Sequence, residues 1–202
     1  MESFEEYFYG DHIFESVEVI EGGLRVRLRP ELVEELLNES PDGITVSDLV
    51  ATVDSGSKKK SRDIKPTFKE IKDGDLLVYQ TTSGTRKDGD NYYTQFIKLK
   101  DLNTYLYDES DATIKDRIKL ALLGDVEVYC DCPAFLYYGF SYMLTQLDAK
   151  YGDEENRYPK VRNPKNKGSV CKHLYSILKV LPVHDGKIIN AISRSVERRR
   201  EN

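Results

Sequence analysis

The chain has 202 residues, of which 39% are hydrophobic, and this is enough apolar sequence to build the core of one ordinary domain or two small ones. The 30 Lys and Arg residues against 35 Asp and Glu residues give a net charge of −5, which argues against a histone-like protein that coats DNA by bulk charge alone. No stretch approaches the roughly 18 consecutive apolar residues of a membrane-spanning helix, and the acidic start of the chain is unlike a secretory signal. We therefore expect a soluble intracellular protein with no membrane partner.

The charge is unevenly distributed along the sequence. Residues 1–50 contain 13 acidic and 3 basic residues, whereas residues 157–202 contain 12 basic and 3 acidic residues. The two ends can neutralise each other within one fold, or they can serve two different partners.

The N-terminal part of the chain contains signals for a hairpin, a helix and a loop. Residues 13–20 and 24–29 alternate apolar and polar side chains on either side of a glycine turn, which predicts a β-hairpin. Pro30 then begins a short amphipathic helix that ends before the Ser-Pro-Asp-Gly sequence at residues 40–43. Residues 54–63 include no apolar residue and predict an exposed loop or linker.

The middle of the chain continues with strands and one helix. Residues 76–82 and 92–99 are rich in β-branched and aromatic residues and predict a second hairpin with a long polar tip. Helical spacing over residues 111–123 predicts a helix that closes at Gly124, and residues 125–129 then alternate like a strand. The fold class predicted from these elements is α+β, made of antiparallel β-hairpins with a few helices.

All three cysteines and one of the three histidines fall into two short pairs, Cys130-Asp131-Cys132 and Cys171-Lys172-His173. An odd number of cysteines without an export signal disfavours a disulfide framework. Three thiolates and one imidazole are a complete ligand set for tetrahedral Zn²⁺ with no open position, so we predict one structural zinc ion. The alternative is three buried free cysteines and an unrelated histidine.

The local settings of the two pairs suit such a site. The first pair follows a predicted strand, where the alternation of side chains places both sulfurs on the same side. The second pair begins a helix, because residues 174–181 have helical spacing up to Pro182. We therefore expect a zinc-stabilised strand, knuckle and helix unit in the C-terminal half, and divide the chain into a β-rich region over residues 1–110 and a zinc-binding region with a helical C-terminus over residues 111–202.

The order C-x-C…C-x-H, with a strand before it and the helical CKHLYSIL after it, resembles the SWIM-type zinc finger, a small fold found in proteins that bind nucleic acid or other proteins. The resemblance implies that the zinc ligands are Cys130, Cys132, Cys171 and His173, and it implies no particular activity. In this chain 38 residues separate the two pairs, which is far more than the family usually has. The wider block, CDCPAFLYYGF, YGDEENRYPKVRNP and CKHLYSIL, also resembles poorly characterised proteins of tailed bacteriophages.

The long insertion between the two pairs has an aromatic part and a basic part. Residues 135–142 are rich in Phe and Tyr, which serve either as core or as an interface. Residues 157–179 contain no acidic residue and predict a surface for nucleic acid or for an acidic protein. The alternative is a solvated loop that balances the acidic N-terminal segment. The candidate contact residues of this loop are Arg157, Lys160, Arg162, Lys165, Lys167 and Lys172.

The sequence contains no Walker loop, nucleophile elbow, H-E-x-x-H motif or deaminase signature. We therefore expect a protein that is not an enzyme and has no small-molecule substrate. The phage resemblance favours a structural or assembly component, incorporated in the virion or present in the host cytoplasm, that acts through contacts with itself or with other phage structural proteins. The alternative is a zinc-stabilised module that binds DNA or RNA through the basic 157–179 loop.

Overall fold

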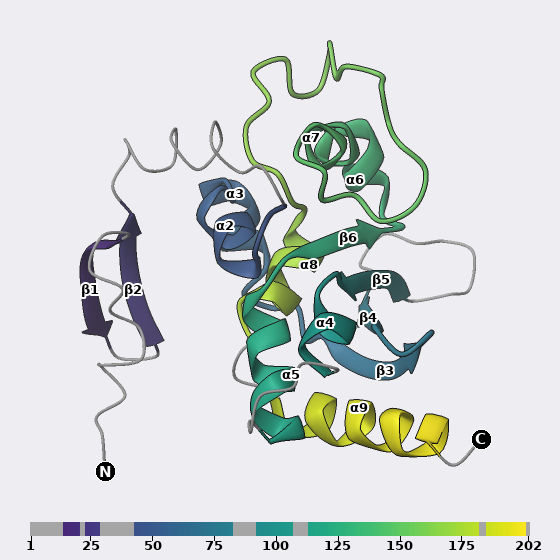
Figure 1. The fold of residues 1–202 in the computed structure, drawn as a ribbon. Helices are drawn as coiled ribbons and strands as arrows, with labels where there is room; N and C mark the ends of the chain where they lie inside the picture. Colours follow the sequence, from purple (N-terminus) through teal and green to yellow (C-terminus); the bar gives the residue numbers. More distant parts are fainter. Residues whose placement is uncertain are drawn as a thin grey trace. The chain divides into compact units, whose positions relative to one another are not determined.

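The computed structural model describes residues 14–20, 23–28, 43–82, 92–106, 113–181 and 185–200 (Figure 1). The chain forms two compact units, Met1–Asp42 and Gly43–Asn202. In the first unit, strands β1 (Phe14–Ile20) and β2 (Gly23–Leu28) pair antiparallel, which confirms the predicted hairpin. The helix predicted after Pro30 lies outside the described residues.

The second unit is built on a four-stranded antiparallel sheet in the order β3-β4-β5-β6. Its strands are β3 (Thr67–Lys72), β4 (Leu76–Thr82), β5 (Tyr92–Leu99) and β6 (Val126–Cys130). The pairing of β4 with β5 confirms the second predicted hairpin, and β6 confirms the strand before the cysteines. Since β6 completes the sheet that β3 to β5 begin, the chain divides after residue 42 rather than at the expected boundary after residue 110.

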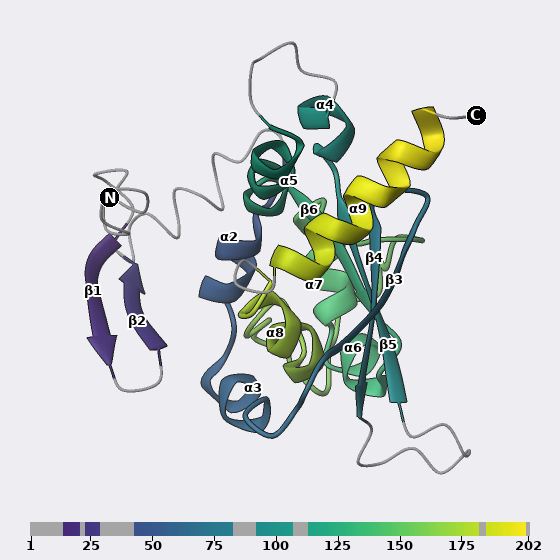
Figure 2. The same ribbon diagram turned by 90° about the horizontal axis from the view of Figure 1, so that it is seen from below.

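The core lies between one face of this sheet and a layer of helices (Figure 2). Every second residue of β5 from Tyr93 to Leu99 is buried, as are Val126, Val128 and Cys130 of β6. Three helices supply the opposing apolar side chains: α5 (Ile114–Leu123), α8 (Lys172–Leu178) and α9 (Asp185–Arg200). Helix α5 ends at the predicted residue, where Gly124 closes the last turn. It begins at Ile114, three residues after the predicted start, because the hydroxyl of Thr113 caps it by accepting from the Asp116 amide. The predicted α+β class is therefore correct.

Five further short helices complete the second unit within the described residues: α2 (Val46–Ala51), α3 (Ser55–Lys60), α4 (Leu102–Leu106), α6 (Pro133–Tyr137) and α7 (Phe140–Gln146). The prediction of a loop or linker over residues 54–63 is wrong, because α3 lies there. The carboxylate of Asp54 accepts from the Ser57 amide at the start of this helix, and Lys58, Lys59 and Lys60 occupy its last turn. Both charges match the helix dipole. Helix α3 buries none of its side chains, so it has no apolar periodicity in the sequence.

Gly139 joins α6 to α7 in a left-handed conformation with φ of 76°. A Cβ at this position would overlap the Pro159 ring. We expect Gly139→Ala to lower the melting temperature more than Gly152→Ala, a matched control with φ of 83° and no atom within 4 Å of the added Cβ. The control variant carries only the backbone strain of a non-glycine residue in the left-handed region, about 1–2 kcal/mol, so the difference between the two variants reports the contact with Pro159. Equal melting temperatures for the two variants, measured by thermal unfolding, would contradict this close contact.

Candidate metal centre

Three segments bring the two predicted pairs together. Strand β6 ends at Cys130, and Cys132 is the N-cap of α6. Cys171 is the N-cap of α8, and His173 lies in its first turn. One ligand atom from each residue lies within 4.8 Å of those of the other three, and all four side chains are buried. The two pairs are therefore adjacent in the fold although 38 residues separate them in the chain.

The donor set and its burial fit a metal ion. All three cysteines are free thiols. In a regular zinc tetrahedron with Zn–S bonds of about 2.3 Å, neighbouring ligand atoms are about 3.8 Å apart, which lies within the 4.8 Å limit on their separation here. The imidazole Nδ1 of His173 is buried without a hydrogen-bond partner in the part of the chain that the structure describes. A buried polar nitrogen is costly unless something binds it, and the cluster can hold a metal ion.

The three thiols are buried next to one another, and this environment shifts their pKa values in different directions. Burial raises the pKa of the Cys130 and Cys171 thiols, since a thiolate loses its hydration there. The hydrogen bond from Cys130 lowers the pKa of Cys132. A bound cation is the partner that stabilises all three thiolates together.

Residues of β5 support the cluster from the sheet. The side-chain amide of Gln95 donates from Nε2 to the Cys130 Sγ at 3.5 Å and to the Thr81 Oγ1 at 2.9 Å. The Tyr93 ring lies 4.8 Å from the imidazole of His173, measured between centroids. Gln95 is not among the site residues predicted from the sequence. What distinguishes Gln95 is that it is polar and fully buried, whereas the other buried residues of β5, Tyr93, Ile97 and Leu99, are hydrophobic.

Gln95 should tune metal affinity without being a ligand. We expect Gln95→Leu to fold but to bind zinc about 10–100-fold more weakly, the usual cost of losing a hydrogen bond to a metal ligand. Thr81→Val is the matched control, because it removes the other partner of the Gln95 amide and leaves the sulfur contact in place. Competition with a chromophoric chelator measures both affinities. Equal affinities would show that the Gln95 amide does not act on the metal centre.

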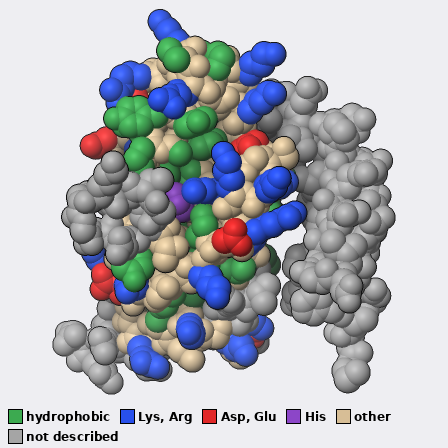
Figure 3. Space-filling view, turned by 180° about the vertical axis from the view of Figure 1, so that it is seen from behind, with side chains coloured by type: hydrophobic (Ala, Val, Ile, Leu, Met, Phe, Trp, Pro, Cys, Tyr) green, Lys and Arg blue, Asp and Glu red, His purple; other side chains and the backbone are tan. Residues whose placement is uncertain are grey.

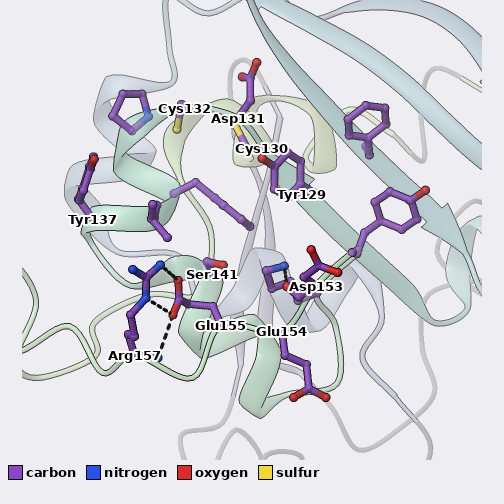
Figure 4. Close-up of a pocket in the computed structure, with 17 residues that line it drawn as sticks. Tyr129, Cys130, Asp131, Cys132, Tyr137, Ser141, Asp153, Glu154, Glu155 and Arg157 are labelled. Atoms are coloured by element: carbon purple, nitrogen blue, oxygen red, sulfur yellow. Dashed lines mark hydrogen bonds and ion pairs between the residues drawn. The ribbon is translucent and has the colours of Figure 1, made fainter.

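A cleft of about 710 Å³ opens beside the cluster (Figure 4). Cys130 and Cys132 form part of its wall, and its aromatic lining is Phe96, Tyr129, Phe135, Tyr137 and Tyr151. The carboxylates that line it are Asp131, Asp153, Glu154 and Glu155, and its two cations are Lys150 and Arg157. Both cations are engaged: the Lys150 ammonium lies 5.8 Å from the centroid of the Tyr129 ring, and the Arg157 guanidinium donates to Glu155. The lining is therefore acidic overall.

The predicted basic residues lie mostly on one ordered, irregular segment, residues 157–168. Arg157, Lys160, Arg162, Lys165 and Lys167 are exposed there, whereas Lys172 lies on α8 and is half-buried. The hydrogen bonds from Arg157 lower the pKa of Glu155 and hold the start of the segment. The Asn163 side chain donates to the Tyr138 carbonyl and accepts from the Lys167 amide, which holds its middle.

The end of the basic segment packs against α2 and α3. Gly168 lies against Asp54, and the hydroxyls of Thr52 and Ser169 are hydrogen-bonded. Cys171 lies three residues after Gly168 and belongs to the candidate metal cluster. Lys58, Lys59 and Lys60 lie in the last turn of α3. Lys and Arg side chains are spread over the face of the molecule that Figure 3 shows.

Comparisons with known proteins found no matching family model, no matching curated protein and no matching solved structure. Among the described residues, none of the helices has the length and apolar character needed to cross a membrane.

Proposed function

We propose that this chain is a non-catalytic, zinc-stabilised module that binds nucleic acid through its basic segment. The observation that carries the proposal is the buried cluster of three thiols and one imidazole at the root of that segment. Sulfur and imidazole nitrogen together favour Zn²⁺ over Mg²⁺ or Ca²⁺, which prefer oxygen ligands. Four protein ligands leave no position for substrate or water, so the zinc is structural.

The architecture around the cluster supports the SWIM-type assignment as part of this proposal. A strand precedes the first pair and a helix begins at the second, as in that family's order of elements. The long insertion consists of α6, α7 and the basic segment. It leaves the metal cluster at Cys132 and returns to it at Cys171, so the metal closes a large loop.

Order in the basic segment supports phosphate binding. Its start, middle and end are held by Glu155, Asn163 and Cys171 respectively, while its cations stay exposed. A segment ordered before binding loses less conformational entropy when phosphates bind. Exposed Lys and Arg on such a backbone position a polynucleotide without reading its sequence.

A second proposal is a structural or assembly role in a tailed bacteriophage particle, through contacts with other copies of the chain or with other phage structural proteins. It is favoured by exposed apolar side chains on the insertion, of which Val161 is 88% exposed and Tyr137 64% exposed. Exposed apolar surface of this kind also suits a protein interface.

Native mass spectrometry of the untagged protein, with and without a chelator, tests these proposals together. We expect one zinc ion per chain, released by the chelator with a broader charge-state distribution as the metal-stabilised region unfolds. A monomer that binds a labelled 20-nucleotide DNA at low salt supports the nucleic-acid proposal. A closed oligomer that binds no nucleic acid would overturn it in favour of assembly, and a chain without zinc would overturn the metal centre.

A further inference from the structure

We propose that Tyr137, Tyr138 and Tyr158 form a stacking platform and that the ligand of the basic segment is a single-stranded polynucleotide rather than a duplex. This inference rests on the proposed nucleic-acid function and names its substrate class. It follows from where the aromatic side chains of the insertion lie relative to its cations.

The aromatic side chains of the insertion divide into a buried set and an exposed set. Phe135 of α6 and Phe140 of α7 belong to the core at 2% and 5% exposure. The three platform tyrosines are 64%, 41% and 43% exposed respectively. Core packing therefore accounts for the two phenylalanines, whereas each of the three tyrosines keeps a large part of its side chain at the surface. Proteins that bind single-stranded nucleic acid commonly have exposed aromatic rings beside Lys and Arg side chains.

Contacts within the insertion place Tyr138 and Tyr158 beside the cations of the basic segment, and Tyr137 lines the cleft together with Arg157. The Tyr138 carbonyl accepts from Asn163, next to Arg162. The Tyr158 ring packs edge-on against Tyr142 of α7 at 5.5 Å between centroids, and its hydroxyl donates to the Pro164 carbonyl. The Tyr138 ring itself stacks on Phe140 at 6.3 Å between centroids. The rings of Tyr138 and Tyr158 are thus held in place while part of each side chain remains exposed. Lys160 and Arg162 follow Tyr158 directly in the chain and supply charge for the phosphates.

The acidic cleft restricts the path of the strand. Tyr137 and Arg157 line it together with the exposed residues Asp153 and Glu154 (Figure 4). Phosphates are repelled by those carboxylates, so the strand should follow the exposed basic segment and place bases on the tyrosines rather than enter the cleft.

Ring stacking decides between a single strand and a duplex. In a duplex the base faces are already stacked on one another, and only phosphates and groove edges remain for the protein. A single strand offers both its phosphates and its base faces, so it can use the cations and the tyrosines together. Neither contact reads the 2′-hydroxyl, so we expect DNA and RNA single strands to bind alike.

The test uses fluorescence anisotropy with the zinc-loaded full chain and three labelled probes: dT20, U20 and a 20-base-pair DNA duplex. We expect Tyr137→Ala to weaken binding of both single strands by about 5- to 100-fold and to leave duplex binding unchanged. Tyr137→Phe should retain binding because it keeps the ring. Leu136→Ala is a matched control, since it removes an exposed apolar side chain from the same helix without removing a ring.

The outcomes separate this inference from the function on which it rests. If the wild type binds all three probes and Tyr137→Ala binds each of them with the same affinity, the stacking platform is overturned and the nucleic-acid function is preserved. Failure of every probe to bind at low salt would overturn both. Equal losses for Leu136→Ala and Tyr137→Ala, accompanied by a change in oligomeric mass, would overturn the platform in favour of a protein interface.

Discussion

Replacement of Cys132 by alanine is expected to abolish zinc binding and to unfold the region around the cluster. The candidate metal cluster joins the end of β6 and the start of α6 to the start of α8, which is distant from them in the sequence. Structural zinc supplies an apparent binding free energy of about 10–16 kcal/mol, similar to the whole stability of an ordinary domain. We expect the melting temperature of Cys132→Ala to fall by at least about 10 °C, measured by circular dichroism.

Val170→Ala is the matched control for this variant. Val170 is fully buried and precedes a metal ligand, yet it offers no ligand atom. Its truncation should cost about 2 kcal/mol, or about 4–8 °C, with one zinc ion retained. A chelator should destabilise the wild type and Val170→Ala but not Cys132→Ala. If Cys132→Ala keeps its zinc, or loses no more stability than Val170→Ala, the metal does not hold this region together.

Joint replacement of Arg162 and Lys165 by alanine is expected to give the second large effect. Both side chains are exposed on the basic segment, so their loss should leave the fold intact. If each contacts a phosphate, the slope of log affinity against log salt should become shallower by about 1.8 on duplex DNA or about 1.4 on a single strand. We expect affinity at 50 mM salt to fall by about 10-fold or more for any sequence.

A charge-matched variant separates this local effect from a change in net charge. Lys69 on β3 and Lys115 on α5 are exposed and lie outside the basic segment, and their joint replacement by alanine removes the same charge. This control should keep both affinity and salt slope close to the wild type. If the two double variants weaken binding equally, attraction by net charge replaces the basic segment as the explanation.

The parts of this structure that follow from sequence are those with a strong local signal. The β-branched and aromatic runs of β4 and β5 identified the central hairpin, and Gly124 marked the end of α5. The four candidate ligands were recognisable because cysteine is rare in this chain and all three cysteines lie in two short pairs. Their proximity follows from two local features, a strand end and a helix start, that both present side chains to one point.

Other parts depend on tertiary context that leaves little mark on the sequence. Strand β3 has mostly exposed or half-buried side chains and is specified by its pairing with β4. Helix α3 buries none of its side chains and depends on the Asp54 cap. The sequence shows that aromatic side chains are frequent over residues 135–142, but only the packing of α6 and α7 separates the buried rings from the exposed ones. Gln95 could be assigned to the cluster only from the structure, because the pairing of β5 with β6 places it opposite Cys130.

X-ray absorption at the zinc edge of the purified, untagged protein tests the metal centre most directly. The four residues predict one zinc ion per chain with a first shell of three sulfur atoms at about 2.3 Å and one nitrogen atom at about 2.0–2.1 Å. The first shell of Cys132→Ala, if any zinc remains, should lose one sulfur. A wild-type shell of oxygen and nitrogen without three sulfurs would contradict the account, because the zinc would then lie somewhere other than between β6 and α8.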